Sequence, residues 1–362
     1  MDAAHGTDPG SGSRLSVVVC CYTTDRWDDI RAAIASVAAQ QPPVRETVIV
    51  VDHCPGLERL AREHLADDAD GSCVRVVANA ERRGLSGARN TGAAEARGDV
   101  VAFLDDDATA EPGWAAAILA GYADAADVLG VGGAVLARWE RGRPGWFPPE
   151  FDWVVGCSYR GGPETAAPVR NFIGANMSFR RTALRSAGGF RIDLGRVGTR
   201  PLGCEETELC LRLTTSRPDA TLLHQPDAVV RHHVPPQRGT WRYFLTRCYG
   251  EGLSKAAVTA RAGATRALAS ERAYLRRTVP RAVTSALRPG PQWSPRRALA
   301  LVAGVSATVL GYGAGTLHRQ TLHRLTPPQT PKSAAESAPA RAPRAAATPA
   351  LLSPGREQGG GA

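Results

Sequence analysis

The most informative stretch of this chain spans residues 79–109 and reads NAERRGLSGARNTGAAEARGDVVAFLDDDAT. Its second half places an apolar run, Val100–Leu104, directly before three consecutive aspartates. α/β sheets bind ligands at the carboxyl ends of their strands, and in an extended chain Asp105 and Asp107 would direct their carboxylates to the same side. This spacing suits a hard divalent cation, Mn2+ or Mg2+, whose coordination a diphosphate would complete. The stretch therefore predicts a cation site, with a solvated acidic turn as the alternative.

A loop of small residues lies in the first half of the same stretch. Gly84, Ser86 and Gly87 let backbone N–H groups approach an anion, and Arg89 projects from the first turn of the helix that follows. The loop therefore predicts a nucleotide-binding site. An ordinary glycine loop with surface arginines is the alternative.

Outward from this stretch, short apolar runs alternate with longer helical segments up to about residue 233. That alternation is typical of an α/β fold in which helices cover a sheet. The predicted strands are Leu15–Cys20, Thr47–Val51, Val74–Ala78, Val100–Leu104, Val128–Val135, Phe172–Phe179 and Ala228–His232. The clearest predicted helices are Asp28–Ala39, Ser86–Ala96 with Ser86 as its N-cap, Glu111–Tyr122 and Glu205–Leu213.

Composition narrows the possible partners. The chain has 362 residues, a net charge of +9 and only two lysines, Lys255 and Lys332. A basic surplus suits nucleotide phosphates, an anionic membrane face or nucleic acid. Zinc-type Cys/His spacing and aromatic-basic RNA motifs are absent from the sequence, so nucleic acid is not an expected partner. Eight scattered cysteines and a polar stretch at residues 1–13, which does not resemble a signal peptide, favour a cytoplasmic location.

The C-terminal third differs in character. Residues 235–295 are predicted to form a helical, basic subdomain, and Ala298–Leu317 is a run of 20 residues without a charge. The segment 296–320 could span a bilayer, lie on the membrane surface or pack as an ordinary helix. The predicted organisation is a disordered segment 1–13, a main domain 14–234, these two C-terminal regions, and a disordered Pro/Ala/Ser-rich tail 321–362.

The ordered motifs between Leu15 and His233 resemble glycosyltransferase family 2, the inverting glycosyltransferases of GT-A fold. The resemblance implies a mixed, largely parallel sheet, here with a C-terminal helical extension. It places Tyr22 and Thr23 at the nucleotide, although the proline and asparagine usual in that loop are missing. It also gives Asp52 a hydrogen bond from the nucleotide base and assigns Gly84 and Arg89 to the donor side. Asp105 then lies near the ribose and the metal, and Asp107 is the principal metal ligand.

Further motifs extend the resemblance to the acceptor side. NFIGANMSFRR implies that Gly174, Ala175 and Asn176 approach the transferred sugar, and GCEETELCLRL resembles the Glu-Asp motif of the family. Glu206 stands where the family has its catalytic aspartate, but either Glu205 or Glu206 could accept the hydroxyl proton. His232 is implied as a further metal ligand. In QRGTWR, Thr240 replaces the arginine of the processive signature, which favours transfer of a single sugar.

The sequence thus predicts a metal-dependent, inverting glycosyltransferase that uses a nucleotide-sugar donor. Its acceptor would be a glycan, a lipid-linked molecule or a small molecule, and the basic, apolar C-terminal region favours cell-envelope or glycolipid synthesis at the cytoplasmic face of a membrane. Two alternatives remain. One is a non-catalytic scaffold of GT-A shape at a membrane. The other is a haloacid dehalogenase-type phosphatase, whose Asp-x-Asp-x-Thr motif is matched by residues 105–109 but whose downstream lysine has no well-placed counterpart.

Overall fold

The computed structural model describes residues 14–65, 74–123, 125–194, 203–263 and 268–325. The chain divides into two units, residues 1–320 and 321–362, and the account below concerns the first. The predicted disordered segment 1–13 and most of the predicted tail lie outside the described residues. The tail prediction began too early, because the last helix continues to Leu325.

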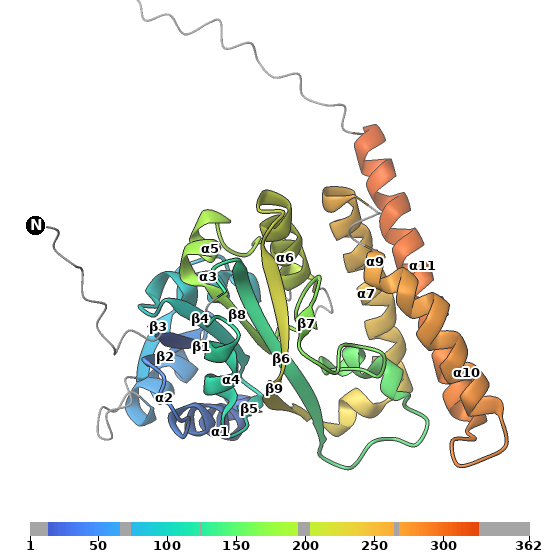
Figure 1. The fold of residues 1–362 in the computed structure, drawn as a ribbon, viewed down its shortest axis with the longest axis horizontal. Coiled ribbons are helices and arrows are strands. Elements are labelled where there is room, and N and C mark those ends of the chain that lie inside the picture. Colours follow the sequence, from blue (N-terminus) through green and yellow to red (C-terminus); the bar gives the residue numbers. More distant parts are fainter. Residues whose placement is uncertain (1–13, 66–73, 124, 195–202, 264–267, 326–362) are drawn as a thin grey trace, which may run out of the picture. The chain divides into compact units, whose positions relative to one another are not determined.

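A mixed sheet forms the centre of the first unit (Figure 1). Its strand order is β3-β2-β1-β4-β8-β6-β9-β5, with β7 paired to β9. The strands β1 to β4 pair in parallel, as β6 pairs with β9, whereas β8, β5 and β7 run antiparallel to their neighbours. Their bounds are β1 Leu15–Cys21, β2 Glu46–Val51, β3 Val74–Ala78, β4 Val100–Asp105, β5 Ala108–Ala110, β6 Val128–Trp139, β7 Ala167–Pro168, β8 Asn176–Arg180 and β9 Thr221–Val234.

Helices cover both faces of this sheet, because side chains of successive strand residues point to opposite faces. In β1, Val17 and Val19 join the core beneath α1, whereas Val18 joins the core beneath α3. Ile30, Ile34 and Val37 of α1 are buried together, as their spacing predicted. The helices of this part are α1 Trp27–Ala38, α2 Pro55–His64, α3 Leu85–Glu95, α4 Trp114–Ala120, α5 Arg181–Ser186 and α6 Glu205–Ser216.

Several predicted boundaries were wrong for local reasons. The strand predicted from Phe172 begins only at Asn176, because Phe172 leaves the strand and its ring packs over Gly130 and Gly132 of β6. Helix α4 starts late because Gly113 before it has a left-handed φ of 84°. Ser86 does not cap α3, which begins after Gly84, and its hydroxyl instead donates to the Leu194 carbonyl. The sequence reading missed α2, α5, β5 and β7.

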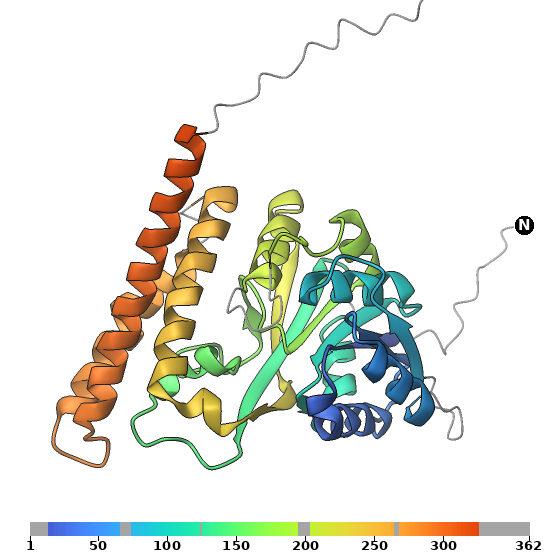
Figure 2. The same ribbon diagram turned by 180° about the vertical axis from the view of Figure 1, so that it is seen from behind.

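The C-terminal helices pack beside the sheet rather than standing apart (Figures 1 and 2). They are α7 Trp241–Ala262, α9 Ala269–Ala273, the π-helical turn η4 Tyr274–Thr278, α10 Val279–Leu287 and α11 Pro295–Leu325. A cluster of aromatic rings joins α7 to the segment 146–151, with Trp146 stacked on Trp241 at 4.2 Å and Phe244 against Phe147. Residues 14–320 therefore form one compact unit. The predicted subdomain boundary near residue 234 stays a prediction.

One described helix is long and apolar enough to cross a membrane. It covers Pro295–His318 within α11 and has a mean hydropathy of 1.6, with 28% of its most apolar window buried. A helix that packs on the protein by one face can have the same length and hydropathy as a membrane span.

Candidate active site

Three predicted metal ligands converge at the carboxyl end of β4. Asp105 ends that strand, Asp106 and Asp107 form a tight turn into β5, and His232 lies on β9, which pairs with β5. One ligand atom from each of Asp105, Asp107 and His232 lies within 4.8 Å of the other two. The convergence arises from the turn and from β9, whereas the expected extended strand through Asp107 is not formed. We call these three residues the Asp-Asp-His group.

Asp107 lies among positive side chains. Its oxygens are 2.9 Å from His232 Nε2, 3.1 Å from a guanidinium nitrogen of Arg238 and 3.2 Å from one of Arg26. Burial alone would raise the pKa of Asp107, but His232 and the two arginines outweigh it and hold that pKa far below its usual range. Burial by itself would lower the pKa of His232, but the adjacent Asp107 raises this pKa to about 10. The histidine and the aspartate therefore form an ion pair.

The two glutamates predicted as candidate bases begin α6. Cys204 precedes them with a left-handed φ of 69°, and the chain enters the helix at Glu205. Glu205 is buried and accepts a 2.8 Å hydrogen bond from Arg89, whereas Glu206 accepts one of 3.3 Å from the hydroxyl of Thr207. Burial and the neighbouring Glu205 raise the pKa of Glu206 to about 8. Such a carboxyl group is a stronger base than an exposed one.

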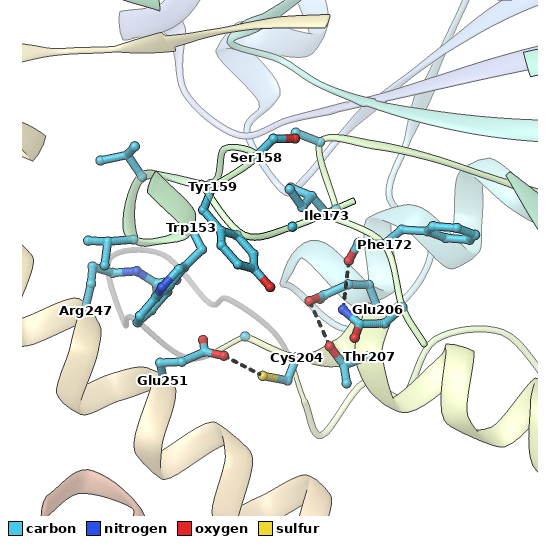
Figure 3. A pocket seen from close by; sticks show the side chains of 18 of the residues that line it. Trp153, Ser158, Tyr159, Phe172, Ile173, Cys204, Glu206, Thr207, Arg247 and Glu251 are labelled. Carbon is cyan, nitrogen blue, oxygen red and sulfur yellow. Dashed lines mark hydrogen bonds between the residues drawn. The ribbon is translucent and has the colours of Figure 1, made fainter. Parts of the chain in front are cut away.

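The Asp-Asp-His group and both glutamates line one cavity of about 770 Å³. Gly174 and Ala175 lie between them on the wall, and Arg26, Arg89 and Arg238 also face this space. Figure 3 shows Glu206 and Tyr159 directed into the cavity, with Arg247 and Glu251 of α7 across it. The cavity thus joins the Asp-Asp-His group to the two glutamates at the first turn of α6.

Comparison with known proteins identifies the family. The model of glycosyl transferase family 2 matches residues 16–188. A glucosyl-dolichyl phosphate glucuronosyltransferase of Haloferax volcanii is 36% identical over 242 residues, which are 67% of this chain and 76% of that protein. The chain belongs to glycosyl transferase family 2.

More distant relatives agree with this assignment. A pre-mycofactocin glycosyltransferase of Mycobacterium tuberculosis is 26% identical over 239 residues, and the chain spans 47% of its length. The crystal structure of GalNAc-T7 with UDP, GalNAc and Mn2+ aligns with a TM-score of 0.50 at 17% identity, over 88% of this chain and 59% of that one. This likeness confirms the predicted GT-A fold. Family membership makes the protein a glycosyltransferase and removes the phosphatase alternative.

The predicted nucleotide-side residues of this glycosyltransferase follow β1 and β2. Asp52 accepts hydrogen bonds from Asn79 at 2.7 Å and from the Gly84 backbone at 3.0 Å, so it holds the loop that leads into α3. Thr23 accepts a hydrogen bond from the backbone of residue 25 and caps a short 3₁₀ turn, and the ring of Tyr22 lies against a guanidinium group. Their contacts with a nucleotide stay predictions.

Arg89 has a different environment from the one the sequence suggested. Its side chain is 2% exposed, and it donates to Glu205 at 2.8 Å, to Asp105 at 3.3 Å and to the Gly174 carbonyl at 3.1 Å. These three partners come from α6, β4 and the loop before β8. Arg89 therefore ties the acidic ends of the cavity together, and its predicted contact with the nucleotide stays a prediction.

Asn176 is placed differently from its neighbours Gly174 and Ala175. It is fully buried, accepts a hydrogen bond from Trp114 at 2.9 Å, and donates to the carbonyls of Ala134 and Ala228. The amide thus joins β8 to β6, β9 and α4 inside the protein. The structure corrects the prediction that Asn176 approaches the sugar. Its amide has a structural role, because its hydrogen-bonding groups are already used inside the protein.

Three residues of the site were missed. Arg26 and Arg238 both contact Asp107, and Asp106 is buried with Arg26 at 2.7 Å. Burial and the adjacent Asp107 raise the pKa of Asp106 to about 7. Arg238 stands in the QRGTWR stretch, 131 residues from Asp107 in the sequence, so no local pattern predicts their contact.

Proposed function

We propose that this enzyme transfers a sugar from a nucleoside diphosphate donor to a hydroxyl group of a lipid-linked glycan, with inversion and with a divalent cation. The observation that supports the proposal is the shared cavity, since its wall carries both the Asp-Asp-His group and Glu206. A direct displacement needs these two functions on either side of the anomeric carbon.

The Asp-Asp-His group fits Mn2+ or Mg2+. Two carboxylates and one imidazole supply three donor atoms within 4.8 Å of one another, which suits a small cation that takes its remaining ligands from a diphosphate. Metal binding requires His232 to give up the proton of its ion pair with Asp107, and Cys157 lies 3.7 Å from the other ring nitrogen. A cation held by these three residues would neutralise the charge that develops on the departing nucleotide.

Residues of the chain supply the remaining steps. Arg26 and Arg238 face the cavity beside Asp107 and are placed to contact the donor phosphates. Glu206 accepts the proton of the acceptor hydroxyl as its oxygen attacks the anomeric carbon, and its raised pKa suits that task. Glu205, paired with Arg89, serves instead to hold the site together. We therefore assign the base to Glu206.

The nature of the acceptor is proposed from the similar protein of Haloferax volcanii, which is named for its action on a glucosyl-dolichyl phosphate. The apolar helix α11 agrees with an acceptor that resides in a membrane. We place the enzyme at the cytoplasmic face of that membrane.

A donor screen tests the proposal. Release of nucleoside diphosphate from UDP-, GDP- and dTDP-sugars is measured with Mn2+, Mg2+ or chelator, for the natural chain and for Asp107→Asn. We expect one donor class to be turned over only with metal, and the variant to lose that turnover. The matched control is Asp99→Asn, because Asp99 is exposed beside the opposite end of β4. Absence of release from all three donor classes, with either metal, would favour the scaffold.

A further inference from the structure

The cavity continues past Glu206 into a second half formed by the C-terminal helices. One side of this half is formed by Leu275 of η4 and by Val305, Thr308, Val309 and Tyr312 of α11. Neither the donor nor the metal chemistry proposed above requires these residues. Their presence in the same cavity as the base points to a role in holding the acceptor.

Two of these residues stand at the mouth of the cavity. Leu275 is 42% exposed and Val309 is 57% exposed, although both line the cavity. Val309 also belongs to a row of exposed apolar side chains along the outer face of α11, namely Leu299, Val302, Val309, Leu310 and Leu317. Val309 therefore belongs both to the cavity wall and to the exposed apolar row of α11. Exposed apolar side chains gathered on one face mark a site of interaction.

The outer face of α11 is fixed in that orientation by its inner face. Figures 1 and 2 show α11 beside α7, and the two helices meet at glycines. A Cβ atom at Gly311 would clash with the Tyr249 carbonyl oxygen, and one at Gly252 with the backbone of Thr308. Helix α7 also carries charged residues, among them Lys255. Because charges are costly in the bilayer core, we infer that α11 rests on lipid with its outer face and does not cross the membrane.

Charged side chains of the second half favour an anionic head group. In the part of the chain that the structure describes, this half is lined by Arg170, Arg247, Lys255 and Arg272 against Glu251 and Glu271. Lys255 lies 2.9 Å from Glu251 and 2.7 Å from Glu271, and Arg170 lies 2.6 Å from Glu271. These ion pairs hold α9 against α7 and leave the balance of charge positive.

We propose that the acceptor is a long-chain lipid phosphate, such as a phosphorylated isoprenoid bearing a sugar. Its head group lies in the second half of the cavity, and its hydrocarbon chain leaves between Leu275 and Val309 onto the outer face of α11. The assignment rests on the proposed function, because it takes Glu206 to face the acceptor hydroxyl.

Binding of three probes tests the assignment by calorimetry on the full chain: farnesyl phosphate, isopentenyl phosphate and inorganic phosphate. We expect farnesyl phosphate to bind at least about tenfold more tightly than isopentenyl phosphate, since several more methylene groups leave water. The double variant Leu275→Asn/Val309→Asn should reduce this ratio to about threefold or less. The matched control is Leu287→Asn, which changes a side chain of α10 that is 54% exposed and belongs neither to the cavity wall nor to the apolar row of α11. It should leave the ratio unchanged.

Three results would overturn the assignment: equal affinities for the two prenyl phosphates, competition by inorganic phosphate as effective as that of isopentenyl phosphate, or an effect of Leu287→Asn equal to that of the double variant. Metal-enhanced stabilisation by a nucleoside diphosphate, measured on the same samples, reports the donor site separately. If that stabilisation is present and the chain-length effect is absent, only the acceptor assignment fails. If both are absent, the proposed function fails with it.

Discussion

Replacement of Glu206 by glutamine removes the proposed base while it keeps the size and nearly the shape of the side chain. A positioned general base typically accelerates its reaction by about 10²–10⁴-fold. At about 1.4 kcal/mol for each factor of ten, the variant should lose roughly 3–5 kcal/mol of transition-state stabilisation. Because Glu206 has few polar partners to lose and does not belong to the Asp-Asp-His group, metal-dependent binding of the nucleotide should be retained.

The pH profile distinguishes a base from a merely structural residue. Burial and Glu205 raise the pKa of Glu206 to about 8, so most of the carboxyl group is protonated at neutral pH. The kcat/KM of the natural chain should rise about tenfold per pH unit below this value and level off above it. In Glu206→Gln this rise should disappear. The assay is release of nucleoside diphosphate in the presence of acceptor, followed from pH 6 to 9.

The same raised pKa predicts a change in stability. The folded state holds the proton of Glu206 more tightly than the unfolded chain, so this group favours folding at low pH. That contribution is lost as the pH rises from about 4.5 through 8. Relative to the natural chain, Glu206→Gln should therefore gain thermal stability as the pH rises over this range. Transfer that survives in Glu206→Gln but is lost in Glu205→Gln would refute the assignment of the base.

Two further substitutions test the structural assignments. Asn176→Ala should lower the free energy of unfolding by about 2–4 kcal/mol, because it leaves the buried Trp114 N–H and two carbonyl groups without their partner. Thermal denaturation measures this loss. An unchanged Tm together with lost activity would instead favour the original prediction that Asn176 contacts the sugar. Gly311→Ala should lower Tm, because the new Cβ atom would displace α11 from the Tyr249 carbonyl. The control is Gly313→Ala, which should leave Tm unchanged because a Cβ atom there meets nothing within 4 Å. Equal Tm values for the two variants would contradict the close packing of α11 on α7.

Local sequence predicted the part of the site at the end of β4. Asp105 lies at the carboxyl end of that strand, and such ends gather at one edge of a sheet whatever the detailed register. The family resemblance implied His232, which lies near the carboxyl end of β9. The family resemblance supplied the order of the motifs. These two sources sufficed for the α/β fold and for the residues that the structure brings together in the Asp-Asp-His group.

The remaining features depend on partners distant in sequence. The amide of Asn176 faces inward because Phe172 has already left the strand to pack over glycines of β6, an arrangement that no local pattern shows. Arg89 was predicted to face the donor nucleotide from the first turn of a helix, whereas its three acceptors come from three separate segments of the protein. The role of α11 as a cavity wall likewise depends on glycine contacts with α7, which the hydropathy of α11 alone could not reveal.

In the proposed mechanism, one cavity holds a divalent cation at its acidic end and a base at the other. Anomalous diffraction at the manganese edge, from crystals grown with Mn2+ and the nucleoside diphosphate found in the donor screen, locates the cation relative to the base. We expect a single strong peak beside Asp105, Asp107 and His232, with the carboxyl group of Glu206 facing the same space. A manganese peak at other ligands, or a wall of protein between the metal and Glu206, would contradict it.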